Sequence, residues 1–165
     1  MHKRRILGID PGTQITGVGI IDFDDQGELS VCYYGSIKTI AKSSLPIRLK
    51  KIYQGLIDII KEYKPDFIAL EDIFYSENIK TAIVMGHARA VAILASINLE
   101  IEPMEYAPRE VKLAVVGRGN ASKSQVQYMV RNILSIKDEI NPPDAADALA
   151  VALCHFNRLN KFDHA

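Results

Sequence analysis

The sequence predicts an α/β fold: a five-stranded mixed sheet flanked by helices on both faces. Three short apolar segments separated by turn residues open the chain, and helical patterns then alternate with two further strands. The 165 residues are 48% hydrophobic and 24% charged, which is typical of a globular protein of domain size. We therefore expect one domain over residues 1–165.

The beginning of the chain supplies the antiparallel part of the sheet. Apolar runs at residues 6–9, 17–21 and 31–34 predict three strands in a meander. Residues 24–27 (DDQG) have the composition of a turn, since glycine tolerates positive φ.

An amphipathic helix and a fourth strand follow the meander. Apolar side chains recur at helical spacing over residues 45–63, and Pro65 ends this helix. Residues 67–70 are fully apolar and lead directly into Glu71, so they predict a buried strand that ends on an acid.

The remaining elements are mostly helical. A long helix is expected over residues 78–97, a fifth strand over residues 101–106 and a short helix from Pro108. Ser122 opens a capping box for the next helix, and the last helix begins at residues 142–143. The apolar stretch 83–99 is interrupted by polar residues and predicts a buried helix, not a membrane span.

Charge and cysteine content narrow the class of protein. The net charge is zero, which argues against a broadly basic DNA coat protein. Within residues 107–137, however, Glu110 is the one acid among six basic residues: Arg109, Lys112, Arg118, Lys123, Arg131 and Lys137. Cys32 and Cys154 form no metal or redox motif, and the basic N-terminus lacks a long apolar segment. We expect a cytoplasmic protein with no membrane association.

Four acids occupy matching ends of predicted elements. Asp10 and Glu71 each end an apolar strand, and Asp144 and Asp147 lie three residues apart in the first turn of a helix. Each acid alone has a simpler explanation as a turn residue or a helix cap. As a set they would repel one another without a cation, and hard oxygen ligands suit Mg²⁺ or Mn²⁺.

Such a cluster predicts two-metal phosphodiester hydrolysis. Two bound ions can activate water and neutralise the leaving oxygen, with no covalent enzyme nucleophile. An alternative is an actin-like or sugar-kinase-like nucleotide-binding fragment, because residues 10–13 (DPGT) followed by Gly17 are similar to its phosphate loop. Those proteins need two domains and an interdomain cleft, which 165 residues do not readily supply. A DNA-binding module without catalysis is a third hypothesis.

Several segments together resemble the RuvC family of Holliday junction resolvases. The resemblance spans residues 6–155, and the Asp-Ala-Ala-Asp-Ala-Leu-Ala block of the last helix is its most specific part. The matching segments are residues 8–12, 69–71, 106–112, 116–117, 123–126 and 143–150. The resemblance implies a ribonuclease H-like fold, with which the predicted order of elements agrees.

The resemblance also implies a function and a set of site residues. It implies a Mg²⁺-dependent crossover junction endodeoxyribonuclease, with Mn²⁺ able to substitute and two ions per site. A homodimer would bind a four-way DNA junction in recombination and repair and nick two opposed strands, with the RuvA–RuvB branch-migration complex as a further partner. The metal-binding acids would be Asp10, Glu71, Asp144 and Asp147, and the basic residues near the cut phosphate would be Lys112 and Lys123.

Some assignments keep an alternative. Phe74 matches an aromatic that stacks on an unpaired base, although a loop aromatic can also pack into the core. Arg118 could contact DNA phosphate or simply be a solvated loop arginine. Asp72 stands where the family commonly has an uncharged amide, and we leave it out of the site. The apolar face near Ile83 and Ala90 is a candidate subunit interface.

Overall fold

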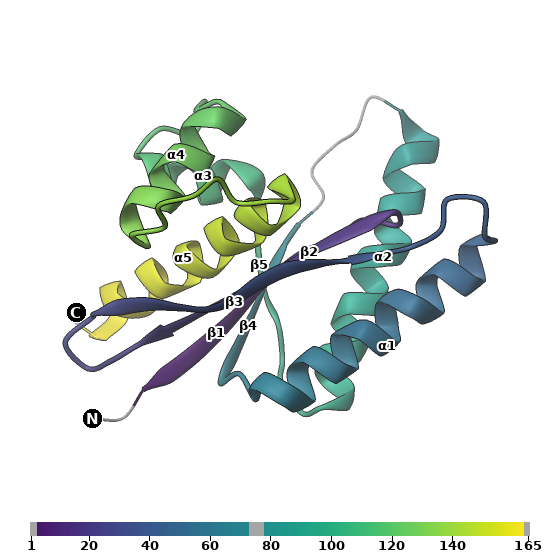
Figure 1. Ribbon diagram of the computed structural model, residues 1–165, viewed down its shortest axis with the longest axis horizontal. Coiled ribbons are helices and arrows are strands. Elements are labelled where there is room, and N and C mark those ends of the chain that lie inside the picture. Colours follow the sequence, from purple (N-terminus) through teal and green to yellow (C-terminus); the bar gives the residue numbers. More distant parts are fainter. Residues whose placement is uncertain (1–2, 73–77, 164–165) are drawn as a thin grey trace.

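The computed structural model describes residues 3–72 and 78–163, and it contains the predicted five-stranded mixed sheet (Figure 1). The strand order is β3-β2-β1-β4-β5. The first three strands are antiparallel neighbours, and the last two run parallel to β1. Their bounds are β1 (Arg4–Asp10), β2 (Ile15–Phe23), β3 (Leu29–Lys38), β4 (Phe67–Glu71) and β5 (Met104–Tyr106).

Helices cover both faces of the sheet, as the sequence predicts. One face carries α1 (Leu45–Tyr63) and α2 (Ile79–Asn98), and the other carries α3 (Pro108–Val116), α4 (Lys123–Ile133) and α5 (Pro143–Asp163) (Figure 1). Alternate residues of the central strands therefore enter two separate cores. Ile6 and Ile21 pack in the core under α5, whereas Leu7 and Ile20 pack in the core under α1 and α2.

Local sequence signals explain where the helices begin and end. The Asn78 side chain accepts hydrogen bonds from the backbone amides of Lys80 and Thr81, and Ser122 forms the predicted capping box with Gln125. At its other end α1 stops at Lys64, which takes a left-handed conformation before Pro65.

Two expectations about α2 and β5 are wrong. The fifth strand begins at Met104 and not at residue 101, because the amide of Ile101 donates to the Ser96 carbonyl oxygen and completes the end of α2. The stretch 83–99 is not a buried helix. Within α2 the fully buried residues are small, and they are Ala88, Ala92, Ala95 and Ser96.

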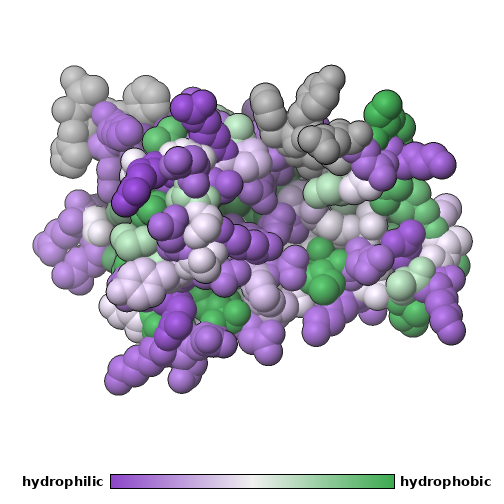
Figure 2. Space-filling model, turned by 90° about the horizontal axis from the view of Figure 1, so that it is seen from above, coloured by the Kyte–Doolittle hydropathy of each residue, from purple (hydrophilic) through white to green (hydrophobic). Residues whose placement is uncertain are grey.

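The outward side of α2 is correspondingly apolar. Within the described residues, α2 is the one helix whose length and composition would allow it to cross a membrane, a test that core helices of other proteins also pass. In the view from above, hydrophilic residues dominate the surface, and hydrophobic residues lie among them at both ends (Figure 2).

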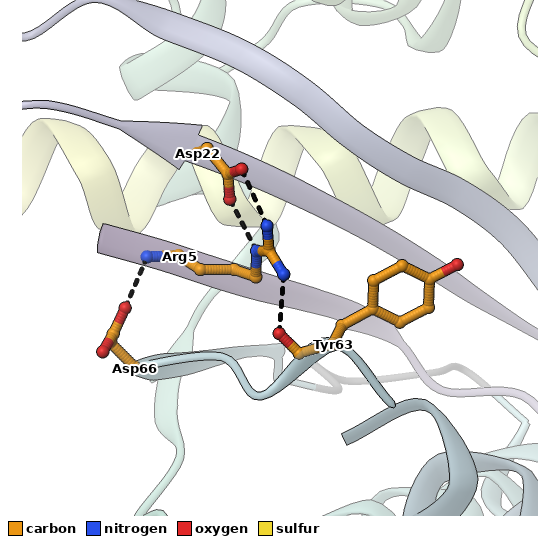
Figure 3. A network of polar contacts seen from close by, with 4 residues as sticks. All are labelled: Arg5, Asp22, Tyr63 and Asp66. Atoms are coloured by element: carbon orange, nitrogen blue, oxygen red, sulfur yellow. Dashed lines mark hydrogen bonds and ion pairs between the residues drawn. The ribbon is translucent and has the colours of Figure 1, made fainter. Parts of the chain in front are cut away.

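The start of β1 is fixed by a network around Arg5 (Figure 3). Its guanidinium pairs with the Asp22 carboxylate on β2, with Nε to Oδ1 at 2.6 Å, and donates to the carbonyl oxygen of Tyr63 at 2.7 Å. The Arg5 backbone amide donates to Asp66 at 2.7 Å. Arg5 thus connects β1 to β2, to the end of α1 and to Asp66 just before β4. These contacts fix the alignment of the three strands at the end of the sheet opposite to Asp10 and Glu71.

Candidate active site

Asp10 and Glu71 lie side by side at the carboxyl ends of β1 and β4. These strands pair in parallel up to Ile9 opposite Leu70, so the next residue of each strand is one of the two acids. The proximity of these two acids could be predicted from the sequence, because each one directly follows a buried apolar run. Open α/β sheets bind ligands beyond the carboxyl ends of their strands.

The remaining two acids reach the same place because α5 crosses β1 and β2 at very close range. Gly17 pairs with Asp10 in the sheet, and a methyl group at Gly17 would overlap the carbonyl oxygen of Asp144. Gly8 contacts the Ala148 backbone in the same way, one helical turn further along. Asp144 and Asp147 project from the first turn of α5, on the side facing Asp10.

All four acids line one pocket of about 450 Å³. Two lysines face it from neighbouring helices, Lys112 from α3 and Lys123 from α4, and the Nζ of Lys123 lies 2.9 Å from Oδ2 of Asp147. Apolar side chains close the remaining walls. The described residues that line the pocket are Asp10, Pro11, Gly12, Ile15, Glu71, Met85, Pro108, Val111, Lys112, Lys123, Val126, Asp144, Asp147 and Ala150.

Crowding of carboxylates shifts their ionisation. Burial and the charge of Glu71 raise the pKa of Asp10 to about 9, and Asp10 donates a hydrogen bond to Glu71. Burial also raises the pKa values of Glu71 and Asp147, although the nearby Lys123 ammonium opposes this effect. In turn, the hydrogen bond to Asp147 raises the pKa of Lys123. Raised pKa values in a cluster of carboxyl groups indicate that the cluster would be stabilised by a cation bound between them.

The pocket's chemistry fits hard divalent cations. Four carboxylates from β1, β4 and α5 supply oxygen ligands, which Mg²⁺ and Mn²⁺ prefer. Across residues 3–72 and 78–163, no three acidic, histidine or cysteine side chains already form a ready-made metal site. Asp10 and Glu71 instead pair with each other, and Asp147 pairs with Lys123.

Other predicted site residues lie elsewhere. Arg118 is exposed in the loop between α3 and α4 and is not among the described residues that line the pocket. Phe74 lies outside the described residues. His155 is buried, and its Nδ1 lies 2.7 Å from the Tyr106 hydroxyl oxygen, whereas His87 is exposed on α2.

An ion-pair cluster next to Glu71 escaped the sequence analysis. Arg89 on α2 pairs through Nε with Asp72 Oδ1 at 3.1 Å and also pairs with Glu105 on β5. The Asp72 amide donates to the Tyr106 carbonyl oxygen at 2.8 Å. The cluster holds the chain directly after Glu71 against β5 and α2. Its one signal in the sequence is an arginine within a mostly apolar helix.

Comparisons with known proteins agree with one another. The family model for crossover junction endodeoxyribonuclease RuvC matches residues 6–155. A relative of that name from Desulforamulus reducens is 50% identical over 150 residues, which cover 91% of each chain. A structure of Thermus thermophilus RuvC in complex with a Holliday junction substrate superposes with a TM-score of 0.90 at 28% identity, covering 96% of each chain. The yeast mitochondrial Holliday junction resolvase Ydc2 shares the fold with a TM-score of 0.70 at 12% identity.

Proposed function

Because the chain belongs to the RuvC family of crossover junction endodeoxyribonucleases, we propose that it resolves four-way DNA junctions by paired symmetric nicks in recombination and repair. The observation that carries this proposal is the pocket in which four carboxylates from three elements face two lysines. The likeness to Thermus thermophilus RuvC, which was solved with a Holliday junction substrate, supports junction DNA as the ligand. We also propose a cytoplasmic location.

The four acids would hold the metal, with Mg²⁺ as the resident ion, Mn²⁺ able to substitute and two ions per site. When bound, such ions activate water and neutralise charge on a phosphate. Asp10 and Glu71 would present their oxygens from the sheet edge, and Asp144 and Asp147 from the first turn of α5. The described residues that line the pocket include no serine, threonine or cysteine, which supports water as the nucleophile.

The two lysines would bind the phosphate that is cut. Lys123 is held beside Asp147 by the 2.9 Å ion pair, so its ammonium stays at the pocket and can approach a phosphate oxygen as charge develops there. Lys112 faces the same space from α3. Val111 and Val126 form an apolar wall, which limits water access and strengthens these interactions. We further propose that Phe74 stacks on a junction base and that Arg118 contacts the DNA backbone.

A homodimer would place two such sites on one junction. The outward side of α2 carries a stripe of apolar residues at helical spacing, including Ile79, Ile83 and Leu94, which are 74%, 58% and 53% exposed. At Gly86, within this stripe, a Cβ would meet no atom within 4 Å. A second copy of α2 could cover the stripe by two-fold symmetry, which matches the symmetry of a four-way junction. The RuvA–RuvB complex stays a proposed partner without assigned contacts.

The competing functions lack comparable support. The actin-like or sugar-kinase-like hypothesis was based on residues 10–13, and it does not account for Asp144 and Asp147, which line the same pocket from the last helix. The family match covers residues 6–155 with a nuclease family. A DNA-binding module without catalysis would have no need for four carboxylates in one pocket.

A junction cleavage assay tests the proposed function. With Mg²⁺ we expect paired symmetric nicks in a synthetic four-way junction and little cutting of linear duplex made from the same strands. Asp144→Asn should reduce cleavage by at least a thousandfold while junction binding persists, because the variant loses one anionic ligand and keeps the surface. The matched control is Asp138→Asn, an exposed acid outside the pocket, which should cut normally. Equal cutting by Asp144→Asn, or cutting without a divalent ion, would contradict the proposal.

A further inference from the structure

A second cavity of about 640 Å³ lies beside the active-site pocket, and we call it the α4 groove. Its walls come from the outer face of α4, from the connection between α4 and α5, and from the first turn of α5. The residues that line it are Ser124, Gln127, Tyr128, Arg131, Glu139, Ile140, Asn141, Pro143 and Ala146. None of these residues has a role in the function proposed above.

The α4 groove and the active-site pocket share the starts of the same two helices. On α4, Lys123 faces the pocket and the next residue, Ser124, faces the groove. On α5, Asp144 and Asp147 face the pocket, whereas Pro143 and Ala146 face the groove. A polymer bound across the pocket can therefore reach the groove by crossing one helix start.

Tyr128 is the one aromatic residue among the described residues that line the groove. The residue is 63% exposed although it lies in the middle of α4, and it also borders a smaller hollow beside Val116 and Met129. An exposed ring between two hollows gains nothing from the core of this chain. It offers a flat surface on which a nucleobase can stack, and every base has such a face.

The other groove residues suit a nucleotide as well. Gln127, Asn141 and Ser124 carry amide and hydroxyl groups, which can donate to and accept from base edges or phosphate oxygens. Arg131 places a positive charge in the wall, where its Nη2 donates to the Lys137 carbonyl oxygen at 2.6 Å. The one acid in the wall is Glu139. The apolar residues of the wall are Ile140, Pro143 and Ala146, and most of the others are polar or charged, so the groove suits nucleic acid better than an apolar protein segment.

We propose that the α4 groove binds the nucleotides next to the cut phosphate, with Tyr128 stacking on one base. This inference rests on the proposed function, because it requires DNA in the active-site pocket. It assigns Tyr128 as a substrate-positioning residue and makes Gln127 and Asn141 candidates for reading the base beside the cut.

Fluorescence of 2-aminopurine tests this proposal. The probe is placed at successive positions on each side of the cut in a synthetic junction, and the protein carries Asp144→Asn so that the junction stays intact. We expect one position at which binding changes the fluorescence through stacking. Adding Tyr128→Ala or Tyr128→Leu should abolish the change there and weaken junction binding by about 5- to 100-fold, whereas Tyr128→Phe should retain both.

The controls separate this inference from the function on which it rests. Ile133→Ala alters α4 outside the groove and should leave the fluorescence profile unchanged. If Tyr128→Ala and Tyr128→Leu keep the wild-type profile and affinity, then the groove does not bind DNA and the inference is overturned. The same result is expected if the groove binds a partner protein instead of DNA. Junction cleavage by the protein without these substitutions would still stand in that case. Failure of the cleavage assay itself would instead remove the proposed function.

Discussion

The helices α2 and α5 are nearly equal in length and both are rich in aliphatic residues, yet they have opposite surroundings. α2 has 20 residues and buries mainly small ones against the sheet, with isoleucine and leucine side chains facing outward. α5 has 21 residues, and every residue from Ala148 to Phe156 is buried between the sheet, α3 and α4. Composition alone thus does not tell a core helix from a helix with an uncovered apolar side.

The difference shows which parts of the molecule are complete in a single chain. α5 needs no partner, and it carries half of the acids of the active-site pocket in a fixed position against β1 and β2. The outward stripe of α2 is as apolar as a core, but no other element of the described chain covers it. For this reason we place the proposed subunit interface there.

Charging the α2 stripe should have the largest effect. Ile83→Glu would bury a carboxylate in each half of a two-fold interface, so we expect the dimer dissociation constant to rise at least a thousandfold. Analytical ultracentrifugation over a range of concentrations measures this change. Thr81→Glu, exposed on the same helix but away from the stripe, is the matched control and should dimerise normally. A dimer that tolerates Ile83→Glu would show that the interface lies elsewhere.

Adding a methyl group where α5 meets β2 should have the next largest effect. Gly17→Ala would push against the Asp144 carbonyl oxygen and displace the start of α5, so we expect at least a hundredfold loss of cleavage rate. Unfolding in urea should show a loss of about 1–3 kcal/mol. Gly86→Ala on α2 has free space around it and should raise the stability of the monomer by up to about 1 kcal/mol, as measured at low protein concentration. Full activity in Gly17→Ala would mean that α5 can shift without harm.

The smallest predicted effect uses one histidine from each helix. Burial lowers the pKa of His155 to about 4, whereas an unfolded histidine titrates near 6.5, so between these values the unfolded state binds more protons. Stability should therefore fall as the pH drops, by about 2 kcal/mol between pH 7 and pH 5 relative to His155→Gln. Urea unfolding at several pH values measures the slope. His87→Gln on the exposed side of α2 should leave the slope as it is in the wild type.

The sequence predicted the order of elements because each one has its own local signal. Polar residues and glycines separate the strands, and Ser122, Pro65 and Pro143 mark helix ends that the structure reproduces. The fifth strand was predicted too long because the bond between Ile101 and Ser96 depends on how α2 ends in three dimensions. Likewise, the outward stripe of α2 could not be distinguished from a buried one by periodicity.

The candidate site divides in a similar way. Convergence of Asp10, Glu71, Asp144 and Asp147 on one pocket was predictable, since each acid stands at the end of an element. The residues that α2 contributes beside the acids were not predictable. Arg89 and Met85 are examples, because their positions depend on how α2 packs on the sheet. Tyr128 was also missed, although the buried Val126 and Val130 place it on the opposite face of an amphipathic helix, where exposure is expected.

The glycines of β1 and β2 have a consequence for altering this enzyme. At Gly8 and Gly17 the obstacle to any larger residue is main chain and not a side chain, so no second substitution nearby can make room for it. Half of the acid cluster therefore keeps a spacing from the other half that ordinary protein engineering cannot adjust. Substitutions intended to change substrate preference are better placed in α3 and α4. Side chains of these helices form the opposite walls of the pocket, and they can be exchanged without moving the contact between α5 and the two strands.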